Sequence, residues 1–146
     1  NRNWFVSFNA TWQKSLDYSR YIAGTNTESE TYKMQLPHIP ILFFNWMLDY
    51  RKDNPFGGKG QYARAYYEGG YTDKYYYGYE LSRNQDYKIP STCLHTVGME
   101  YGIMNRKILF GVECHNLFDT DEMTNFNYPL AGRTIMAKIR FTTLKW

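Results

Sequence analysis

The 146-residue sequence lacks the long apolar stretch of a membrane-spanning helix, because no run of about 18 apolar residues occurs in it. It has only two cysteines, Cys93 and Cys114, too few to indicate a disulfide framework. An excess of one charge is missing as well. The net charge is +3 and the basic residues form no stripe, so we expect no nucleic-acid partner.

Recognisable catalytic patterns are also missing. No serine lies near a histidine and an aspartate in a nucleophile elbow, and no glycine-rich loop suits a phosphate group. Glu100 and Glu113 could approach each other across a hairpin and act as acid and base. Nothing in the pattern positions a substrate beside them, so we expect no enzymatic activity.

Alternation is the dominant feature of what remains. Apolar and polar side chains alternate in six segments, at residues 3–14, 41–51, 61–82, 92–103, 107–118 and 135–141. Period two predicts β-strands whose two faces meet different surroundings. In the third segment, Gly69 and Gly70 predict a bulge or a break into a hairpin. No segment keeps helical periodicity, so we predict an all-β fold, an antiparallel meander of about six strands.

The short connection between the fourth and fifth segments predicts a strand register. If Asn105 and Arg106 form a two-residue turn, Val97 pairs with Cys114, and the apolar sides of both strands coincide. Asparagine at the first turn position also suits the positive φ that such turns require.

Four neighbouring cysteines and histidines raise the possibility of a metal site. In the predicted register, Cys93, His95 and Cys114 share the apolar side and His115 points away from it. An ion on an apolar face is costly, so we expect no metal and no other cofactor. Cys93 and Cys114 lie too far apart along the ladder for a disulfide of normal geometry.

The six segments divide their side chains into two sets. The apolar set, which would face lipid if the strands cross a membrane, contains Trp4, Val6, Phe8, Trp12, Phe44, Trp46, Val97, Tyr101, Phe110, Val112, Ile135, Ile139 and Phe141. The polar set, which would line a lumen, contains Asp49, Arg64, Glu68, Glu100, Glu113, Lys138 and Arg140. We expect the polar set to form ion pairs, such as Arg64 with Glu68 and Glu113 with Lys138, although lining a transport path is the other interpretation.

Two architectures would produce this alternation. A soluble β-sandwich or small barrel buries one face of each strand in a dry core. A membrane barrel turns one face to lipid and the other to a wet lumen, and it has short turns at one end and longer loops at the other. The predicted connections differ in length in that manner, with long ones at residues 16–38 and 119–132 and a tight one at residues 104–107.

Two motifs flank the last connection. The fifth strand runs into Asn-Leu-x-Asp, here Asn116 to Asp119, and the last strand follows Pro-x-x-Gly-Arg, here Pro129, Gly132 and Arg133. Together they resemble the C-terminal strands of TonB-dependent outer-membrane receptors, most clearly over residues 88–143. We expect these residues to be structural, with proline stiffening the loop and glycine permitting an unusual backbone. Trp146 departs from the alternation of the last strand.

The resemblance implies that residues 1–146 are a fragment of a 22-stranded transmembrane β-barrel in a Gram-negative outer membrane, without the plug domain and the earlier strands. Such receptors import a scarce ligand (a siderophore, haem, cobalamin or a glycan) with energy from the TonB complex acting through the plug. The partners implied are outer-membrane lipid, the TonB complex and a small-molecule or glycan ligand. We also expect the isolated fragment to self-associate. A soluble β-sandwich or barrel binding module is the alternative.

Overall fold

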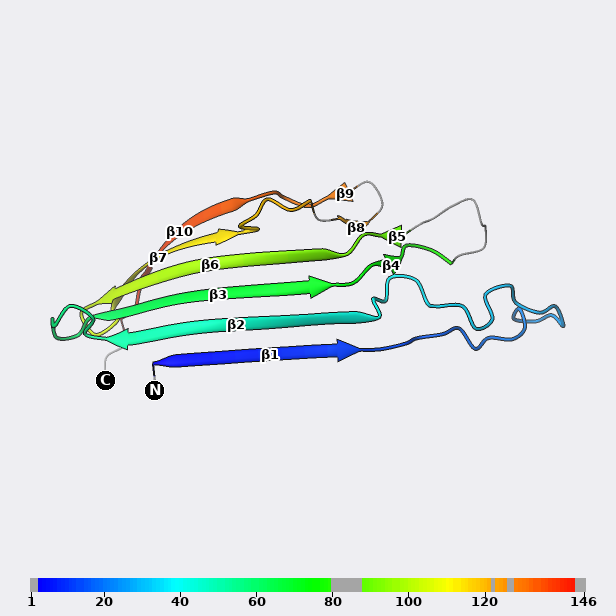
Figure 1. Ribbon diagram of the computed structural model, residues 1–146, viewed down its shortest axis with the longest axis horizontal. Helices are drawn as coiled ribbons and strands as arrows, with labels where there is room; N and C mark the ends of the chain where they lie inside the picture. Colours follow the sequence, from blue (N-terminus) through cyan, green and yellow to red (C-terminus); the bar gives the residue numbers. More distant parts are fainter. Residues whose placement is uncertain (1–2, 80–87, 122, 126–127, 144–146) are drawn as a thin grey trace.

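A computed structural model describes residues 3–79, 88–121, 123–125 and 128–143. Its main element is a six-stranded antiparallel sheet in the order β1-β2-β3-β6-β7-β10 (Figure 1). Its strands are β1 (Trp4–Trp12), β2 (Leu42–Asp53), β3 (Tyr62–Thr72), β6 (Thr92–Ile103), β7 (Ile108–His115) and β10 (Thr134–Phe141). Two short pairs lie in the connections: β4 (Tyr75–Tyr76) with β5 (Lys88–Ile89), and β8 (Met123–Asn125) with β9 (Tyr128–Pro129).

The predicted antiparallel meander is confirmed, because the six strands of the main sheet lie side by side in chain order. The predicted hairpin register is confirmed too, since Val97 pairs with Cys114. Asn105 and Arg106 have φ angles of 56° and 65°, as a turn of this type requires. The part of the chain that the structure describes contains no helix, hence none long and apolar enough to cross a membrane. Trp146 lies outside that part.

The third strand differs from the prediction. It passes Gly69 and Gly70 without a bulge, in unbroken register with Trp46 and Asn45. The indole ring of Trp46 lies over Gly69 and leaves no room for a Cβ there. Gly69 therefore makes room for the Trp46 ring and does not interrupt the strand pairing. The strand ends at Thr72 instead, and the chain resumes pairing only in the short β4.

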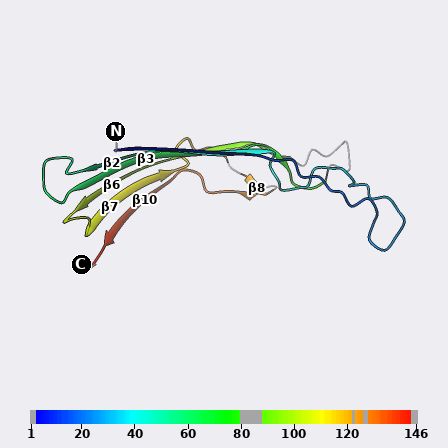
Figure 2. The same cartoon turned by 90° about the horizontal axis from the view of Figure 1, so that it is seen from below.

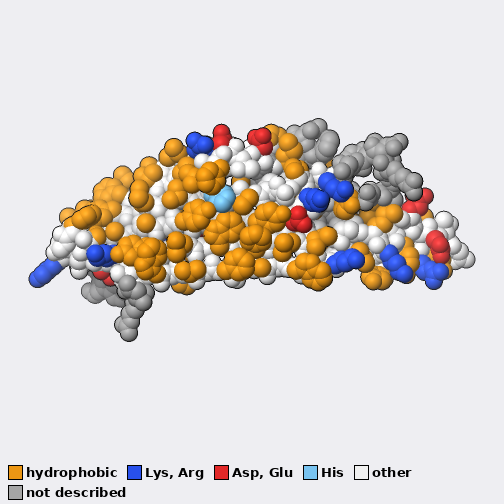
Figure 3. Space-filling view, viewed as in Figure 1, with side chains coloured by type: hydrophobic (Ala, Val, Ile, Leu, Met, Phe, Trp, Pro, Cys, Tyr) orange, Lys and Arg blue, Asp and Glu red, His pale blue; other side chains and the backbone are white. Residues whose placement is uncertain are grey.

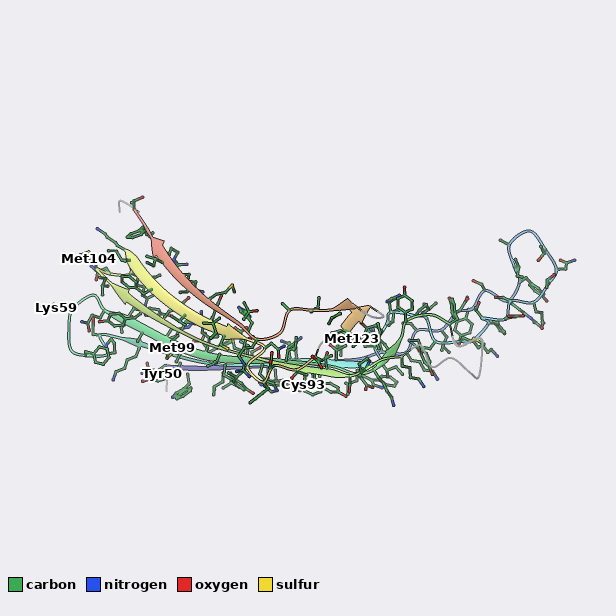
Figure 4. All side chains as sticks on the ribbon, turned by 90° about the horizontal axis from the view of Figure 1, so that it is seen from above. Tyr50, Lys59, Cys93, Met99, Met104 and Met123 are labelled. Carbon is green, nitrogen blue, oxygen red and sulfur yellow. The ribbon has the colours of Figure 1, made fainter. Side chains whose placement is uncertain are left out.

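The sheet is a single curved layer. Figure 2 shows β7 and β10 bending away from the plane of β1 to β3. The face seen in Figure 3 is covered mainly by hydrophobic side chains. It is the convex face, on which Tyr50 and Cys93 lie in Figure 4. The opposite, concave face carries the polar residues.

Little apolar surface is buried between elements. Among the described residues, the buried hydrophobic side chains are Tyr62, Tyr66, Ile89 and Leu109. Every residue of the last strand, β10, is exposed, and the first strand, β1, is exposed except for one half-buried position. A soluble sandwich needs a second layer against one face, and the described part of the chain supplies none. The two outermost strands also leave one backbone edge each without a described partner strand.

The connections are short at one end of the sheet and long at the other (Figure 1). The two short turns contact each other, because the Asn105 amide donates to the Gly60 carbonyl at 2.9 Å. The Arg106 guanidinium also pairs with Asp53 at 2.7 Å and lies over the ring of Tyr62. We call these contacts the turn clasp. They join the β2–β3 and β6–β7 hairpins at the short-turn end.

The long connection between β1 and β2 folds back on itself as an extended hairpin. Asp17 holds it together, because its carboxylate accepts hydrogen bonds from the Thr31 hydroxyl and the Ser19 amide, both at 2.7 Å. The Tyr79 hydroxyl, from the next long connection, donates to the same carboxylate at 3.3 Å. These hydrogen bonds, from Thr31 first and Ser19 next, lower the pKa of Asp17 below its ordinary value. Two long loops are therefore joined at one carboxylate.

Candidate functional site: a charged ladder on the concave face

The strand register separates the two predicted sets of side chains completely. Every member of the apolar set lies on the convex face, and every member of the polar set lies on the concave face. Arg51, Arg64, Glu100, Gly111 and Lys138 lie directly opposite one another, in that order, on β2, β3, β6, β7 and β10. A row of charges therefore crosses five strands of the sheet.

Asp49 is the buried centre of one half of this row. Its side chain is fully buried, with 0% of its surface exposed. Arg51 approaches one of its oxygens at 2.7 Å, and Arg64 approaches the same oxygen at 2.8 Å. A buried carboxylate is costly unless it is paired and hydrogen-bonded, and these two guanidinium groups satisfy that requirement.

Lys138 is the centre of the other half. Its ammonium lies 3.2 Å from Glu100 and 3.4 Å from Glu113. It reaches Glu100 by crossing Gly111, whose missing side chain leaves the space for the lysine stem. Arg64 joins the two halves, because its guanidinium also lies 3.7 Å from Glu100.

The complete arrangement is a chain of alternating charges, which we call the charged ladder: Arg51, Asp49, Arg64, Glu100, Lys138 and Glu113. It contains equal numbers of positive and negative groups, so its net charge is zero. The two glutamates considered above as acid and base are both neighbours of one lysine. Its ion pairs join side chains from five strands of the sheet, β2, β3, β6, β7 and β10.

Tyr66 extends the ladder by one group. Its hydroxyl donates to Glu113 at 2.5 Å across the intervening strand β6. The ring lies over Gly98, where no Cβ would fit. His115 lies 3.4 Å from the other oxygen of the same glutamate. Tyr66 was missed as a site residue, although its even number in the third segment already places it on the side of Arg64.

Two expected members remain outside the ladder, and one expected pair is wrong. Arg64 pairs with Asp49 and Glu100, not with Glu68, which lies opposite Thr96 instead. Arg140 lies on the same face opposite Leu109, without an ion-pair partner among the residues described. The expected pair of Glu113 and Lys138 is confirmed at 3.4 Å.

A hollow of about 430 Å³, lined by both polar and apolar side chains, opens beside the ladder on the concave face. Its rim includes Asn9, Asn45, Glu68 and Thr96, which come from four neighbouring strands. Gly70 lies at the same level and has no side chain to fill the space. The hollow offers amide, hydroxyl and carboxylate groups beside the apolar side chains of Phe5, Met47 and Leu94, and this mixture suits a solute with both polar and apolar parts.

The cysteines and histidines do not assemble a metal site within the part of the chain that the structure describes. On the convex face, His95 accepts or donates a 2.6 Å hydrogen bond with the Tyr67 hydroxyl, and Cys93 lies 3.4 Å from its other nitrogen. Cys114 lies on the neighbouring strand β7, opposite Val97, which is two residues beyond His95 on β6. Both cysteines are free thiols.

The two sequence motifs meet at the entrance to the last strand. The Asn116 side chain closes its own turn through two hydrogen bonds with the Thr120 backbone, at 2.8 and 2.9 Å. Asp119 accepts a hydrogen bond from the Arg133 amide at 2.7 Å. Gly132 is not in the left-handed region, which corrects the expectation of an unusual backbone. Its role is close approach, since a Cβ would lie 2.8 Å from the Asp119 carboxylate.

Pro129 pairs with Met123 in the small β8–β9 ladder within the same connection. The motif residues thus tie the end of β7 to the start of β10 across the loop. The chain matches none of the protein-family models, curated proteins or solved structures with which it was compared.

Proposed function

We propose that this chain forms part of the wall of a 22-stranded outer-membrane β-barrel, the C-terminal part of a TonB-dependent transporter that takes up a scarce ligand. The observation that carries the proposal is the separation of side chains on a single-layer sheet. The convex face is mainly apolar across all six strands, with Lys52 and His95 as exceptions, whereas the concave face bears the charged ladder. A barrel wall with lipid outside and water inside needs that sense of curvature.

The exposed apolar residues support the lipid side of the proposal. Phe8, Val112, Ile135 and Ile139 are each at least half exposed, at 64%, 50%, 71% and 62%. Apolar area of this extent is rarely left in water by a soluble monomer. Aromatic residues lie toward the ends of the strands, such as Trp4 and Trp12 on β1, where membrane barrels place their interfacial girdles.

The edges of the sheet support a larger closed structure. Both outer strands, β1 and β10, leave backbone groups without a described partner strand, and an unpaired backbone edge in lipid is very costly. Closure with further strands removes both edges at once. The ligand would bind among the long loops, and a plug driven by the TonB complex would release it into the lumen.

The decisive experiment is extraction of the protein that carries this chain. We expect it to sediment with outer membranes, to require detergent for release and to run faster on a gel when unheated than when boiled. TonB-dependent uptake would then be measured with labelled siderophore, haem, cobalamin and glycan in cells with and without TonB. Release by salt alone, with no difference in mobility on heating, would contradict the proposal.

A further inference from the structure

An apolar hollow of about 490 Å³ interrupts the convex face near the short turns. Its floor is formed by Ala63 and Ala65, two small residues on the apolar side of β3. Tyr50 flanks them from β2, and Met99 and Tyr101 flank them from β6. Small side chains between large ones leave a slot, and the volume falls in the range of small-molecule sites (roughly 300–1,000 Å³).

Phe56 completes one wall of this slot. It belongs to the turn between β2 and β3, and its ring centroid lies 6.1 Å from that of Tyr101. The ring remains 81% exposed, so it stands over the slot without filling it. The slot is therefore open along one side and lined almost entirely by carbon.

One lysine lies on the face of the slot, at the end nearest the turns, and a second lies in the adjoining turn. Lys52 pairs with Ala63 and so belongs to the same face as the slot. Lys59, labelled in Figure 4, lies in the connection between β2 and β3, to which Phe56 also belongs. Neither lysine has an ion-pair partner among the residues described. The nearby Asp53 belongs to the opposite face and is paired with Arg106 at 2.7 Å.

We propose that this slot binds one acyl chain of an anionic phospholipid, with the phosphate beside Lys52 and Lys59. The inference rests on the proposed function in one respect, that the convex face meets lipid. An apolar slot with Lys52 beyond its end and Lys59 in the adjoining turn matches an apolar chain that ends in a phosphate. A second copy of this chain fits less well, because in a membrane the two-fold axis would run along the bilayer normal and would place the same lysines of both copies at the same end of the contact.

The test is native mass spectrometry of the detergent-solubilised protein with phosphatidylglycerol and phosphatidylcholine of identical acyl chains. We expect the wild-type protein to retain more phosphatidylglycerol than phosphatidylcholine. Lys52→Gln and Lys59→Gln should each weaken phosphatidylglycerol binding about fivefold and leave phosphatidylcholine unchanged. Lys74→Gln, an exposed lysine at the long-loop end, is the matched control and should change neither.

Filling the slot tests the acyl-chain part separately. Ala65→Phe should reduce retention of both lipids, whereas Ala10→Phe, on the same face of β1 but outside the slot, should not. If Ala65→Phe fails to fold, Phe56→Ala removes the wall supplied by the turn without altering the sheet and should also reduce retention of both.

Three results would overturn this inference. If the wild type retained the two lipids equally, the lysines would not bind the phosphate of an anionic lipid. If both Ala65→Phe and Phe56→Ala retained as much lipid as the wild type, the slot would not be the binding site of the acyl chain. A change in oligomeric mass without a change in bound lipid would identify a second copy as the occupant. In each case a protein that still requires detergent and shows heat-modifiable mobility would leave the proposed barrel intact.

Discussion

The hydroxyl of Tyr66 reaches Glu113 two strands away, at 2.5 Å, by lying across Gly98. The glycine supplies the space and the glutamate supplies the acceptor, so the ring connects β3 to β7 over β6. This contact ties together strands that share no backbone hydrogen bonds.

The first prediction concerns this contact. Gly98→Ala should lower the free energy of unfolding by about 1–3 kcal/mol, because the added methyl group collides with the ring. Tyr66→Phe keeps the ring but removes a hydrogen bond to a charged group and should cost a similar amount. Gly78→Ala is the control, since a Cβ there meets no atom within 4 Å. Equal denaturation midpoints for Gly98→Ala and Gly78→Ala would contradict the prediction.

The second prediction compares two aspartates. Asp49→Ala removes the anion that Arg51 and Arg64 share and should destabilise the protein by about 1–3 kcal/mol, because hydrogen bonds between charged groups are lost. Asp53→Ala breaks an exposed pair with Arg106 and should cost no more than about 1 kcal/mol. Urea unfolding of both variants measures the difference. Similar losses for the two would show that burial of Asp49 does not matter.

The third prediction tests which medium meets each face. Leu48 and Met47 are adjacent on β2, and the register places them on the convex and concave faces respectively. Leu48→Arg should destabilise the folded form by about 2–4 kcal/mol, because arginine then faces lipid, and the heat-modifiable fraction should fall accordingly. Met47→Arg should be tolerated much better. A soluble sheet with water on both faces would tolerate the two substitutions about equally.

The fourth prediction concerns pH. The folded pKa of Asp17 lies below the ordinary value of an aspartate, so its hydrogen bonds stabilise the loop above that ordinary pKa, and this stabilisation is lost as the pH falls through the folded pKa. Thr31→Val removes the hydrogen bond that lowers the pKa of Asp17 most, and should therefore raise that pKa toward the ordinary value of an aspartate. An NMR titration of the Asp17 carboxyl carbon measures both values. Identical titration of the wild type and Thr31→Val would contradict this account.

The fifth prediction concerns the isolated 146-residue chain in buffer without detergent. It should associate through its two backbone edges and its apolar convex face. Light scattering after gel filtration should therefore show a mass above that of the monomer, 17.4 kDa. A single monomeric species with native β-sheet circular dichroism would argue against open edges.

The alternation of side chains predicted which face each residue occupies but not which charges meet. Positions four apart on a strand share a face, yet they lie about 13 Å apart along it, whereas directly opposed residues are about 5 Å apart. The expected pair of Arg64 and Glu68 fails for this reason, and Glu100 on the neighbouring strand is the closer partner. Only the tight turn at residues 104–107 fixed a register in advance. Glu113 lies on β7, one of the two strands that this turn joins.

Glycines account for most of what the sequence could not predict. Gly69, Gly98 and Gly111 each lie beneath a large side chain from a neighbouring strand. Which side chain crosses which glycine depends on the pairing of strands that are distant in sequence. A glycine pair therefore suggested a break at Gly69, although the register there is unbroken.

The turn clasp makes the two ends of this sheet mechanically unequal. Asn105 bound to Gly60, and Arg106 bound to Asp53, fasten both hairpins at one base. A force applied to the long loops therefore acts at the end of the sheet opposite to the turn clasp. Strand separation should begin at the loop rim, and the anchored base should be the last part to open.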